Sequence, residues 1–443
     1  MAEPIDIVIL TNGPGEVATW VKPVVRSLYQ KTSQKTSQKA PTKTPQYRIS
    51  VLLSPCPHAS GQEATVLQSY AEVSRVQSAD HFFKFLLTGK TKDSWQWHPK
   101  GVVVFLGGDQ FYTLLVAKRL GYRTVTYAEW DARWIRQIDS FGVMRSALAD
   151  KAPARYQHKF TEVGDLMADV QTSADRAEIF ATLGVDPAAE LIGFLPGSKP
   201  VKLTTGLPLS LAIAHLLHSQ SARSLTHPST RQYVIGVAPN LTLTDPARYA
   251  DPALNPAVEI MQSPPAQLIE PTSGLPYFQI ENGPKIFLWQ RFPALDLFSQ
   301  CQLCFTTIGA NTAQLGALAT PMIAVIPTQR LEAARLADGL LGFLARLPGA
   351  ETITRNLIDP LIIKAVRKSG RHFAWPNIWA KREIVPELFG PITAPEVVAL
   401  AQTYLTHPEK LANQRQTLQA LRGPAGAADK MASLILQTVH YPK

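Results

Sequence analysis

Acidic side chains follow two of the apolar runs in this chain of 443 residues. Glu16 comes after the run at 5–10 through a turn of sequence NGPG, and Asp109 comes after the run at 101–107 behind two glycines. The carboxyl ends of parallel strands meet at one edge of a sheet, so we expect both carboxylates at that edge. They could act as a general base and an electrostatic partner if burial raises one pKa toward neutrality. A first-turn carboxylate that only complements the helix dipole is the alternative for Glu16.

A glycine turn in the second half of the chain is suited to phosphate. Gly197, Ser198 and Lys199 follow the apolar run at 191–197 and precede a helical pattern. Backbone amides of such a turn, with a hydroxyl and an ammonium, can hold a diphosphate. The spacing is not that of a Walker loop, and a simple helix cap is the alternative.

A second glycine turn follows a later strand. Gly309 allows a tight turn, and Asn311 and Thr312 begin a helix of small residues that ends before Pro321. Small residues let the helix lie close to the sheet, with its positive end toward the strand edge. We expect this helix end to attract a phosphate.

Apolar β-branched runs alternate with helical patterns along most of the chain, which is typical of βα units around parallel sheets. Nearly continuous apolar content indicates strands covered on both faces. The predicted strands lie at 5–10, 47–53, 101–107, 123–129, 160–164, 191–197, 231–239, 284–290, 302–309 and 321–327.

The strand pattern divides into two series, which favours two α/β domains over one long sheet. We predict one Rossmann-like domain at 1–185 and another at 186–390. Residues 391–443 have helical periodicity and are expected to pack back on the first domain. The segment 241–283 is rich in Pro, Asp and Ser, and we interpret it as a loop excursion.

The net charge of +10 indicates an anionic partner such as phosphate or an anionic membrane surface. No zinc finger, RNP-like or basic-zipper motif is present, so nucleic acid is not expected. The chain lacks a signal peptide and any uninterrupted apolar run of ~18 residues, which favours a cytoplasmic location. The three cysteines agree with this, and the pair in "CQLC" is interpreted as part of a buried strand. We expect no metal site and no cofactor.

Two basic stretches stand out. The first, at 31–46, contains four lysines and no acid and is interpreted as an inserted surface loop. The second, at 364–382, places Phe373, Trp375 and Trp379 among six Lys or Arg residues. Such a mixture suits an interface with anionic lipid, and a plain surface with buried tryptophans is the alternative.

Six motifs in order resemble the lipid-A-disaccharide synthase family of inverting glycosyltransferases, which have the GT-B fold. They are GPGE, GGD, VGDLMAD, LPGSK, TTIGANTAQLGALATPM and PNIWAKREIVPEL, and they span nearly the whole chain. Trp20 and Gln314 stand where the family has acids, and Lys199 stands where it has Arg.

The resemblance implies two Rossmann-like domains facing a central cleft, a UDP-sugar donor held by the second and a lipid-like acceptor held by the first. It assigns Glu16 and Asp109 to the acceptor side, one of them as the base. The residues that it implies for the donor nucleotide-sugar are Gly197, Ser198, Lys199, Gly309, Asn311, Thr312, Asn377, Arg382 and Glu387.

The leading hypothesis is therefore a hexosyltransferase that inverts the donor sugar. It would dock as a peripheral protein on the cytoplasmic face of the inner membrane, with a homodimer as one option for its assembly. A UDP-sugar epimerase-like enzyme is the second hypothesis. A non-catalytic relative that binds a nucleotide-sugar or lipid, motivated by Trp20 and Gln314, is the third.

Overall fold

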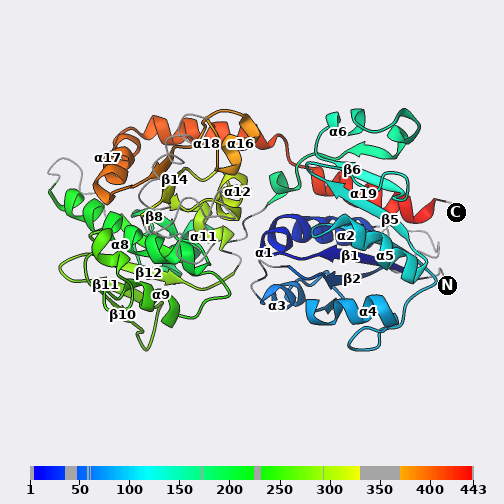
Figure 1. The fold of residues 1–443 in the computed structure, drawn as a ribbon, viewed down its shortest axis with the longest axis horizontal. Helices are drawn as coiled ribbons and strands as arrows, with labels where there is room; N and C mark the ends of the chain where they lie inside the picture. The colour runs from blue at the N-terminus through cyan, green and yellow to red at the C-terminus, as the bar shows by residue number, and fades with distance from the viewer. Residues whose placement is uncertain are drawn as a thin grey trace, which may run out of the picture. The chain divides into compact units, whose positions relative to one another are not determined.

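The computed structural model (Figure 1) divides the chain into two units, each built on one sheet. Unit 1 comprises Met1–Gln171 and Arg422–Lys443, and unit 2 comprises Thr172–Leu421. The residues that the structure describes are 4–34, 47–56, 59, 61–170, 172, 174–223, 231–292, 294–329 and 370–441.

The sheet of unit 1 has seven parallel strands in the order β3-β2-β1-β4-β5-β6-β7. All seven residues of β1 are buried, as expected of a central strand covered on both faces. The strands are β1 (Ile5–Thr11), β2 (Tyr47–Leu53), β3 (Arg75–Gln77), β4 (Lys100–Phe105), β5 (Arg123–Ala128), β6 (Ser140–Val143) and β7 (Phe160–Glu162).

Helices cover both faces of this sheet. The π-helical turn η1, where the hydrogen bonds skip one more residue than in an α-helix, lies directly after α1. The helices are α1 (Pro14–Glu16), η1 (Val17–Val21), α2 (Lys22–Gln34), α3 (Glu63–Gln68), α4 (Phe82–Thr88), α5 (Gln110–Leu120), α6 (Ala147–Asp150) and α19 (Ala427–His440), with the 3-10 turns η2 (Ala79–His81), η3 (Ala154–Lys159) and η4 (Leu166–Asp169).

The last helix of the chain, α19, belongs to unit 1 and lies against its sheet in Figure 1. Thr438 donates a buried hydrogen bond from Oγ1 to Ser140 Oγ at 2.9 Å. A methyl group on Gly142 of β6 would lie 2.6 Å from the sulfur of Met431, so the helix packs directly on the strand.

Within the described residues, the sheet of unit 2 has eight strands in the order β10-β11-β12-β9-β8-β13-β14-β15. Its pairs are parallel except for β10 with β11 and β11 with β12, which are antiparallel. The strands are β8 (Glu190–Leu195), β9 (Arg231–Gly236), β10 (Ala266–Ile269), β11 (Tyr277–Ile280), β12 (Lys285–Trp289), β13 (Leu303–Thr306), β14 (Met322–Pro327) and β15 (Glu387–Gly390).

The longest helix of unit 2, α8, is a core helix. By length and composition alone, Pro200–Ser221 could cross a membrane, but 67% of the apolar window is buried inside the protein. The helices of this unit are α7 (Arg176–Leu183), α8 (Pro200–Arg223), α9 (Thr244–Ala250), α10 (Ala257–Ile260), α11 (Leu295–Ser299), α12 (Ala310–Ala317), α16 (Trp375–Ala380), α17 (Ala394–Leu405) and α18 (Pro408–Arg422).

The prediction of two Rossmann-like domains is confirmed, but the units do not end where the sequence suggested. The first boundary lies after Gln171 because Phe180 of α7 packs in one apolar cluster with Leu191 of β8. Val397 of α17 packs in the other apolar cluster of unit 2. Of the predicted C-terminal helices, α19 therefore returns to the first sheet, and α17 does not.

The segment 241–283 is not the loop excursion that we expected. It forms two short helices and the antiparallel strands β10 and β11 at the edge of the sheet. The strands are only four residues long and are flanked by prolines, so their apolar pattern is weak.

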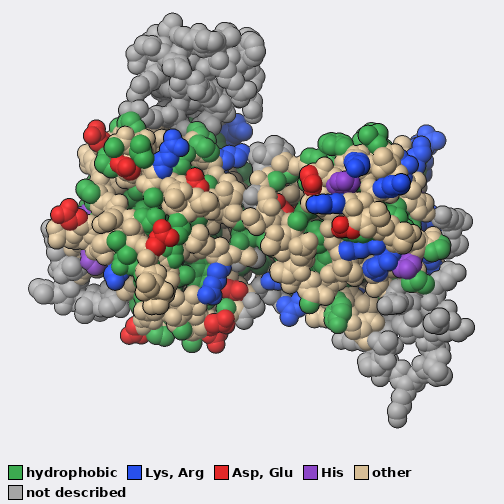
Figure 2. All heavy atoms as spheres, turned by 90° about the horizontal axis from the view of Figure 1, so that it is seen from below, with side chains coloured by type: hydrophobic (Ala, Val, Ile, Leu, Met, Phe, Trp, Pro, Cys, Tyr) green, Lys and Arg blue, Asp and Glu red, His purple; other side chains and the backbone are tan. Residues whose placement is uncertain are grey.

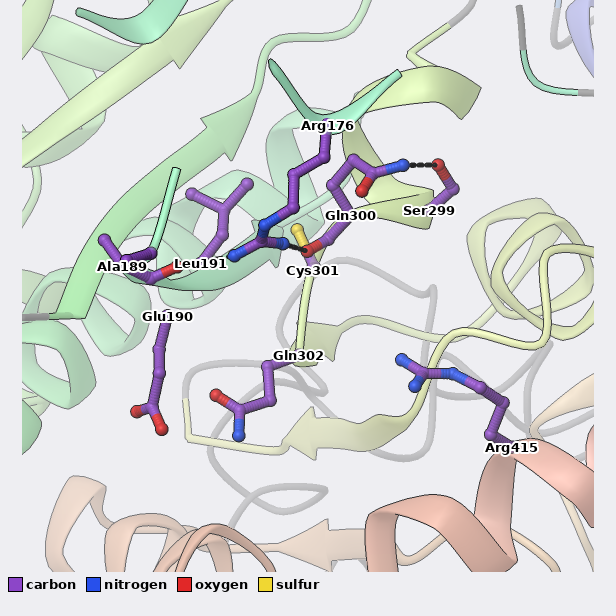
Figure 3. Close-up of a pocket in the computed structure, with 10 residues that line it drawn as sticks. Arg176, Ala189, Glu190, Leu191, Ser299, Gln300, Cys301, Gln302 and Arg415 are labelled. Carbon is purple, nitrogen blue, oxygen red and sulfur yellow. Dashed lines mark hydrogen bonds between the residues drawn. The ribbon is translucent and has the colours of Figure 1, made fainter. Parts of the chain in front are cut away.

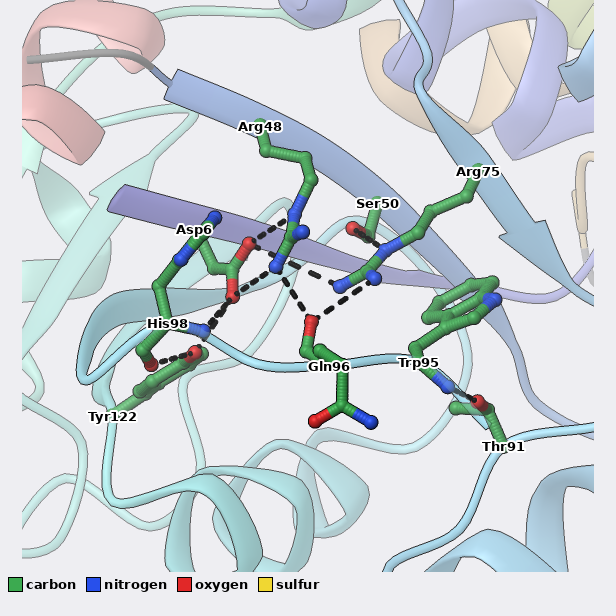
Figure 4. Close-up of polar contacts among 9 residues, drawn as sticks. All are labelled: Asp6, Arg48, Ser50, Arg75, Thr91, Trp95, Gln96, His98 and Tyr122. Carbon is green, nitrogen blue, oxygen red and sulfur yellow. Dashed lines mark hydrogen bonds and ion pairs between the residues drawn. The ribbon is translucent and has the colours of Figure 1, made fainter. Parts of the chain in front are cut away.

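A buried polar network (Figure 4) fixes the amino ends of the first strands of unit 1. Asp6, fully buried in β1, accepts hydrogen bonds from Arg48 Nε at 2.8 Å, from Tyr122 Oη at 2.8 Å and from the His98 amide at 2.8 Å. Burial alone would raise the pKa of Asp6, but these donors and the Arg48 charge outweigh it and lower the pKa.

Arg75 extends this network. Its guanidinium lies 4.4 Å from the ring centre of Trp95 and 4.6 Å from that of Trp97. Burial, aided by the Arg48 charge, lowers the pKa of Arg75 to about 10. The network lies at the amino edge of the sheet and has a structural role.

The cysteine pair is buried, as the sequence suggested. Cys304 is part of β13, and Cys301 lies two residues before the strand begins. Burial, followed by the hydrogen bond with Cys301, raises the pKa of the Cys304 thiol well above its usual value.

Where it is described, the second basic stretch fits the alternative given for it, a plain surface with a buried tryptophan, and residues 31–34 of the first stretch belong to α2. Residues 35–46 of the first stretch and 364–369 of the second lie outside the described residues. In the rest of the second, Trp379 is buried and stacks on Trp375 at 5.8 Å, and Phe373 stacks on Phe389 at 5.4 Å. These rings pack within unit 2, so the described part of this stretch does not present them to a membrane.

Candidate functional site

The carboxyl edge of the first sheet brings the GPGE and GGD motifs together. Leu106 follows β4, and its carbonyl accepts a hydrogen bond from Thr11 Oγ1 at 3.0 Å. Gly107 and Gly108 come next, with φ of +131° and +102°. A methyl group on Gly107 would lie 3.0 Å from Glu16 Cγ, so the glycine is needed for the acidic side chain to lie against this turn.

Glu16 ends α1 and directly precedes the π-helical turn. A methyl group on Gly13 would lie 2.4 Å from its Oε2, so the carboxylate folds back over its own turn. The side chain thus lies between the turns after β1 and β4, at the edge that the sequence predicted.

Asp109 has a different environment. It is exposed and begins α5 as its N-cap, and its Oδ1 accepts a hydrogen bond from the Phe111 amide at 2.9 Å. An N-cap aspartate satisfies an otherwise unpaired amide of the first turn. The structure therefore gives Asp109 a structural role that the sequence analysis did not consider.

Glu129 is an acid that the sequence analysis missed. It directly follows β5, at the same edge of the sheet as Glu16, and it is half-buried. Burial is the largest cause that raises the pKa of Glu129 to about 7, followed by the Asp165 charge and, more weakly, the Glu16 charge. Arg422 and the Trp130 side chain act in the opposite direction. A carboxyl with such a pKa can accept or donate a proton near neutral pH.

The groups around Glu129 are held by a buried ion pair. Arg422 donates from Nη1 to Asp165 Oδ2 at 2.6 Å, and both side chains are buried. Asp165 also accepts the Met167 amide at 2.9 Å, which fixes its orientation. Burial lowers the pKa of Arg422, against the opposing charges of its acidic neighbours.

Aromatic side chains form one wall of this acidic cluster. Tyr127 donates from its hydroxyl to the Gly164 carbonyl at 3.2 Å. Trp20 meets the Tyr127 ring edge-on, with 5.2 Å between ring centres. The tryptophan that departs from the family pattern is thus packed beside the candidate acids.

In unit 2, one lysine joins the two glycine turns. Lys202, in the first turn of α8, donates from Nζ to the Ile308 carbonyl at 2.5 Å. A methyl group on Gly197 would lie 2.9 Å from Lys202 Cδ, and one on Gly309 would lie 3.2 Å from its Nζ. Burial, followed by the Lys199 charge, lowers the pKa of Lys202. The turns after β8 and β13 therefore meet around a mostly buried ammonium.

Further groups at this edge are suited to an anion. Thr307 is buried, and its Oγ1 has no hydrogen-bond partner among the described residues. Gly197 and Gly309 have φ of +104° and +118°. Gly309 is the N-cap of α12, so the positive end of this helix faces the turn. Asn311 lies in the first turn of α12 and is half-buried.

The LPGSK turn contributes less than expected. Lys199 is exposed, whereas Lys202, one helical turn later, approaches the second glycine turn. Ser198 is half-buried, and its carbonyl accepts a hydrogen bond from Asn240 Nδ2 at 3.3 Å. Lys202 and Thr307 are the residues that the sequence analysis missed here.

The hydroxyl of Thr312 makes its hydrogen bonds within unit 2. It is fully buried, donates from Oγ1 to the Gly309 carbonyl at 2.8 Å and accepts the Trp375 amide at 3.1 Å. It ties α12 to α16, and the donor-binding role that the resemblance implies for it stays a prediction.

Asn377 is likewise structural. It is fully buried and donates from Nδ2 to Val385 O at 2.8 Å and to Glu387 Oε1 at 2.7 Å. Its Oδ1 accepts the Ile384 and Val385 amides at 2.6 and 2.9 Å. The amide group is engaged within the protein, and a contact of Asn377 with the donor stays a prediction.

Glu387 also holds this segment together. Its Oε1 accepts the Ala374 amide at 2.7 Å, and both carboxylate oxygens accept the Phe373 amide at 3.1 Å. Arg382 is exposed. A donor contact by either side chain stays a prediction.

A cavity of about 390 Å³ in unit 2 lies at the opposite edge of the sheet, at the amino ends of β8 and β13 (Figure 3). Arg176 lines it but donates to the carbonyls of Pro187 and Ala189, each at 2.8 Å. Its guanidinium also lies 4.1 Å from the Phe180 ring centre. Because ligands of parallel sheets bind at the carboxyl ends, we assign no role to this cavity.

A second cavity, of about 370 Å³, lies beside α2 in unit 1. Lys22 and Arg26 line it on one side, and Asp169 and Asp429 line it on the other. Asp169 accepts the amides of Gly426 and Ala428, each at 2.5 Å, and so caps α19. The mixed charge of the lining gives no selectivity for an anion.

Comparison with known proteins agrees with this architecture. No protein-family model matches the chain. The chain is 23% identical over 405 residues to a protein of Geobacter metallireducens named lipid-A-disaccharide synthase, covering 86% of this chain and 87% of that protein.

Solved structures share the fold. A Listeria monocytogenes protein assigned as a UDP-N-acetylglucosamine 2-epimerase superposes with a TM-score of 0.53 at 11% identity, covering 100% of this chain and 99% of that one. Acinetobacter baumannii MurG gives a TM-score of 0.42 at 12% identity, covering 98% and 99%, which is too low for any further conclusion. The fold is therefore of the GT-B type, with two Rossmann-like α/β units.

Proposed function

We propose that this chain is an inverting glycosyltransferase that moves a hexose from a UDP-sugar to a lipid-like acceptor. The observation that carries the proposal is the arrangement in unit 2 of Lys202, the Thr307 hydroxyl and the positive end of α12 around two glycine turns. A partly buried cation, a hydroxyl without a hydrogen-bond partner among the described residues and a helix N-terminus together favour a dianionic group such as a diphosphate.

The donor side follows from this arrangement. Lys202 and the amides after Gly309 would neutralise the charge that develops on the leaving diphosphate. The names of the relatives support the choice of UDP, since the Listeria protein is named for a UDP-sugar. The Geobacter relative is named for a transferase of lipid A synthesis, which supports transfer to a lipid-like acceptor.

The acceptor side requires a base. Glu129 has the pKa that such a base needs, and Glu16 lies close enough for its charge to contribute to that pKa. In the proposed step the acceptor hydroxyl oxygen bonds to the anomeric carbon from the face opposite the diphosphate. The carbon–diphosphate bond breaks, UDP leaves with that electron pair, and the hydroxyl proton passes to the Glu129 carboxylate.

The test is product analysis by mass spectrometry of the purified chain with UDP-hexoses and UDP-N-acetylhexosamines, with and without a panel of glycolipid acceptors. Acceptor-dependent UDP release, with a glycolipid heavier by one sugar, supports the proposal. The absence of any product across the panel, together with UDP binding by calorimetry, would favour a non-catalytic binding protein instead.

A UDP-sugar epimerase is the second candidate, favoured by the likeness to the Listeria protein. Conversion of the donor without acceptor, to an epimerised sugar or to free UDP and sugar, would identify it. The two reactions differ in their need for acceptor, so one set of incubations separates them.

The cellular setting stays a prediction. Because the proposed acceptor is lipid-like, we expect a cytoplasmic protein that binds reversibly, as a peripheral protein, to the inner membrane. Fractionation of cells, with and without a high-salt wash of the membranes, tests this expectation.

A further inference from the structure

Large apolar side chains are exposed on one part of unit 1. Leu87 and Phe83, four residues apart on α4, are 79% and 53% exposed. Residues four apart lie on the same side of a helix, while Phe82 and Phe85 of the same helix are buried in the core. The outer face of α4 thus presents two large apolar side chains beside the exposed Lys84, and among the described residues Phe83 touches only the edges of neighbouring rings.

Aromatic rings continue this surface toward the carboxyl edge of the sheet. Phe83 lies 6.3 Å from Tyr112, the third residue of α5, measured between ring centres. Its neighbour Phe111 is 40% exposed and lies 5.1 Å from Trp134, which is 42% exposed. We call these residues, Leu87, Phe83, Tyr112, Phe111 and Trp134, the aromatic strip.

Trp134 is held in an unusual backbone conformation, with φ of +60°. Bulky residues seldom adopt the left-handed region, and an exposed tryptophan there costs free energy through both backbone and hydration. The Trp134 carbonyl accepts the amides of Gln137 and Ile138, which fixes the turn that presents the ring.

Basic side chains border the strip. Lys84, Lys90 and Lys92 are exposed, and no acid lies between residues 82 and 92, although the exposed Asp80 and Asp93 flank this segment. Arg119 donates to the carbonyls of Leu86 and Leu87 at 2.6 and 2.7 Å, which places its charge at the end of α4. Figure 2 shows Lys and Arg side chains and hydrophobic patches on the part of the molecule that unit 1 forms.

We propose that the aromatic strip and its bordering cations dock unit 1 on an anionic lipid bilayer. Rings and aliphatic tips enter the headgroup boundary, while lysines and arginines meet the lipid phosphates. The net charge of +10 adds a favourable long-range attraction. A protein partner is less favoured, because interfaces between proteins are depleted in lysine at their centre.

The position of the aromatic strip also indicates which edge of unit 1 would lie near the bilayer. Phe111 is two residues from Asp109, and Trp134 is five residues from Glu129, so the strip begins beside the acceptor edge. A lipid-like acceptor would therefore pass from the bilayer to the acidic cluster over a short path. This surface differs from the basic stretch at 364–382, whose described rings are packed within unit 2.

The test is flotation of the full-length chain with vesicles of phosphatidylcholine, with and without about 30 mol% phosphatidylglycerol. We expect binding only with the anionic lipid, and less of it as salt is raised. Phe83→Ser with Leu87→Ser should lower the partition coefficient at least about tenfold. Lys84→Glu should lower it roughly tenfold without removing an apolar group.

Leu254→Ser is the matched control, because Leu254 is 60% exposed but belongs to unit 2. It should bind like the wild type. Wild-type binding by the double variant, or equal binding to neutral and anionic vesicles, would overturn the proposal. A change of oligomeric state in the double variant, measured by light scattering with vesicle binding unchanged, would instead assign the strip to a second copy of the chain. No sugar donor is needed, so these outcomes are independent of the proposed function.

Discussion

Lys202 Nζ donates to the backbone carbonyl of Ile308 at 2.5 Å, which joins the first turn of α8 to the loop after β13. The two residues are 106 positions apart in the sequence. The ammonium is mostly buried, and burial and the Lys199 charge lower its pKa. An incoming diphosphate would supply the negative charge that this site lacks.

Lys202→Met should therefore weaken UDP binding more than Lys199→Met does. Methionine keeps the stem that packs on Gly197 and removes only the charge. A charged hydrogen bond contributes about 1.5 to 3 kcal/mol, so Kd should rise roughly tenfold to a hundredfold by titration calorimetry. Lys199 is exposed, and its variant should change Kd only about threefold. Equal effects of the two substitutions would contradict the assignment of Lys202.

Glu129→Gln should lower kcat at least about a hundredfold, the usual scale for loss of a general base. In the wild type, kcat/KM should rise as pH passes about 7, where Glu129 loses its proton. The Gln variant should lack this rise. Glu16→Gln removes one of the charges that raise this pKa, so its profile should shift to lower pH. If the profiles of kcat/KM against pH of both variants coincide with that of the wild type, Glu129 is not the base.

The same carboxyl affects stability. Its pKa is raised on folding, so between about pH 4.5 and 7 the folded state binds more protons than the unfolded state, and stability falls as pH rises. Allowing for partial exposure, ionised Glu129 destabilises the fold by about 2 kcal/mol above pH 7. Glu129→Gln should thus be more stable than the wild type at pH 8 and similar at pH 4.5. Urea unfolding at the two pH values measures the difference.

Asp109 can be tested by two substitutions that separate its possible roles. Asn can still accept the Phe111 amide, so Asp109→Asn should keep both stability and turnover within about threefold of the wild type. Asp109→Ala removes the cap and should cost about 1 kcal/mol in denaturant unfolding. A large loss of turnover in a stable Asn variant would show that the carboxylate acts on the substrate.

The lowered pKa of Asp6 predicts a pH dependence of stability opposite to that of Glu129. Its pKa is lowered, so its stabilising contribution is present above the unfolded value near pH 4 and is lost as pH falls through the lower folded value. Asp6→Ala leaves Arg48 without its buried partner and should cost about 3 to 5 kcal/mol at pH 7. The difference from the wild type should shrink near pH 2. Asp93→Asn, at an exposed site, is the control and should show no such trend.

Central strands were predictable because they are buried on both faces. The apolar run at 47–53 matches the bounds of β2, Tyr47–Leu53. Short edge strands such as β3 (Arg75–Gln77) carry too few apolar residues to stand out. The return of α19 to the first sheet was expected from its periodicity, but the assignment of α17 to unit 2 depends on packing that periodicity does not encode.

The candidate site was only partly predictable. Glu129 follows its strand as Asp109 does, so the same rule could have found it, but it was counted as the last residue of the strand. Lys202 gives no local signal, since its role arises from a contact with a distant loop. Thr312 and Asn377 carry the residue types of a binding site, but their polar atoms connect α16 to α12 and to the segment that leads into β15.

The position of α19 constrains how the protein is made. Gly142 of β6 has no room for a side chain because Met431 occupies that space, and Ser140 accepts the Thr438 hydroxyl. Most of unit 1 precedes unit 2 in the sequence, but α19 follows unit 2, so the sheet of unit 1 is covered only after unit 2 has been synthesised. Unit 2 can therefore fold first during translation. Until α19 has been synthesised, the sheet of unit 1 keeps an apolar face exposed that chaperones could bind.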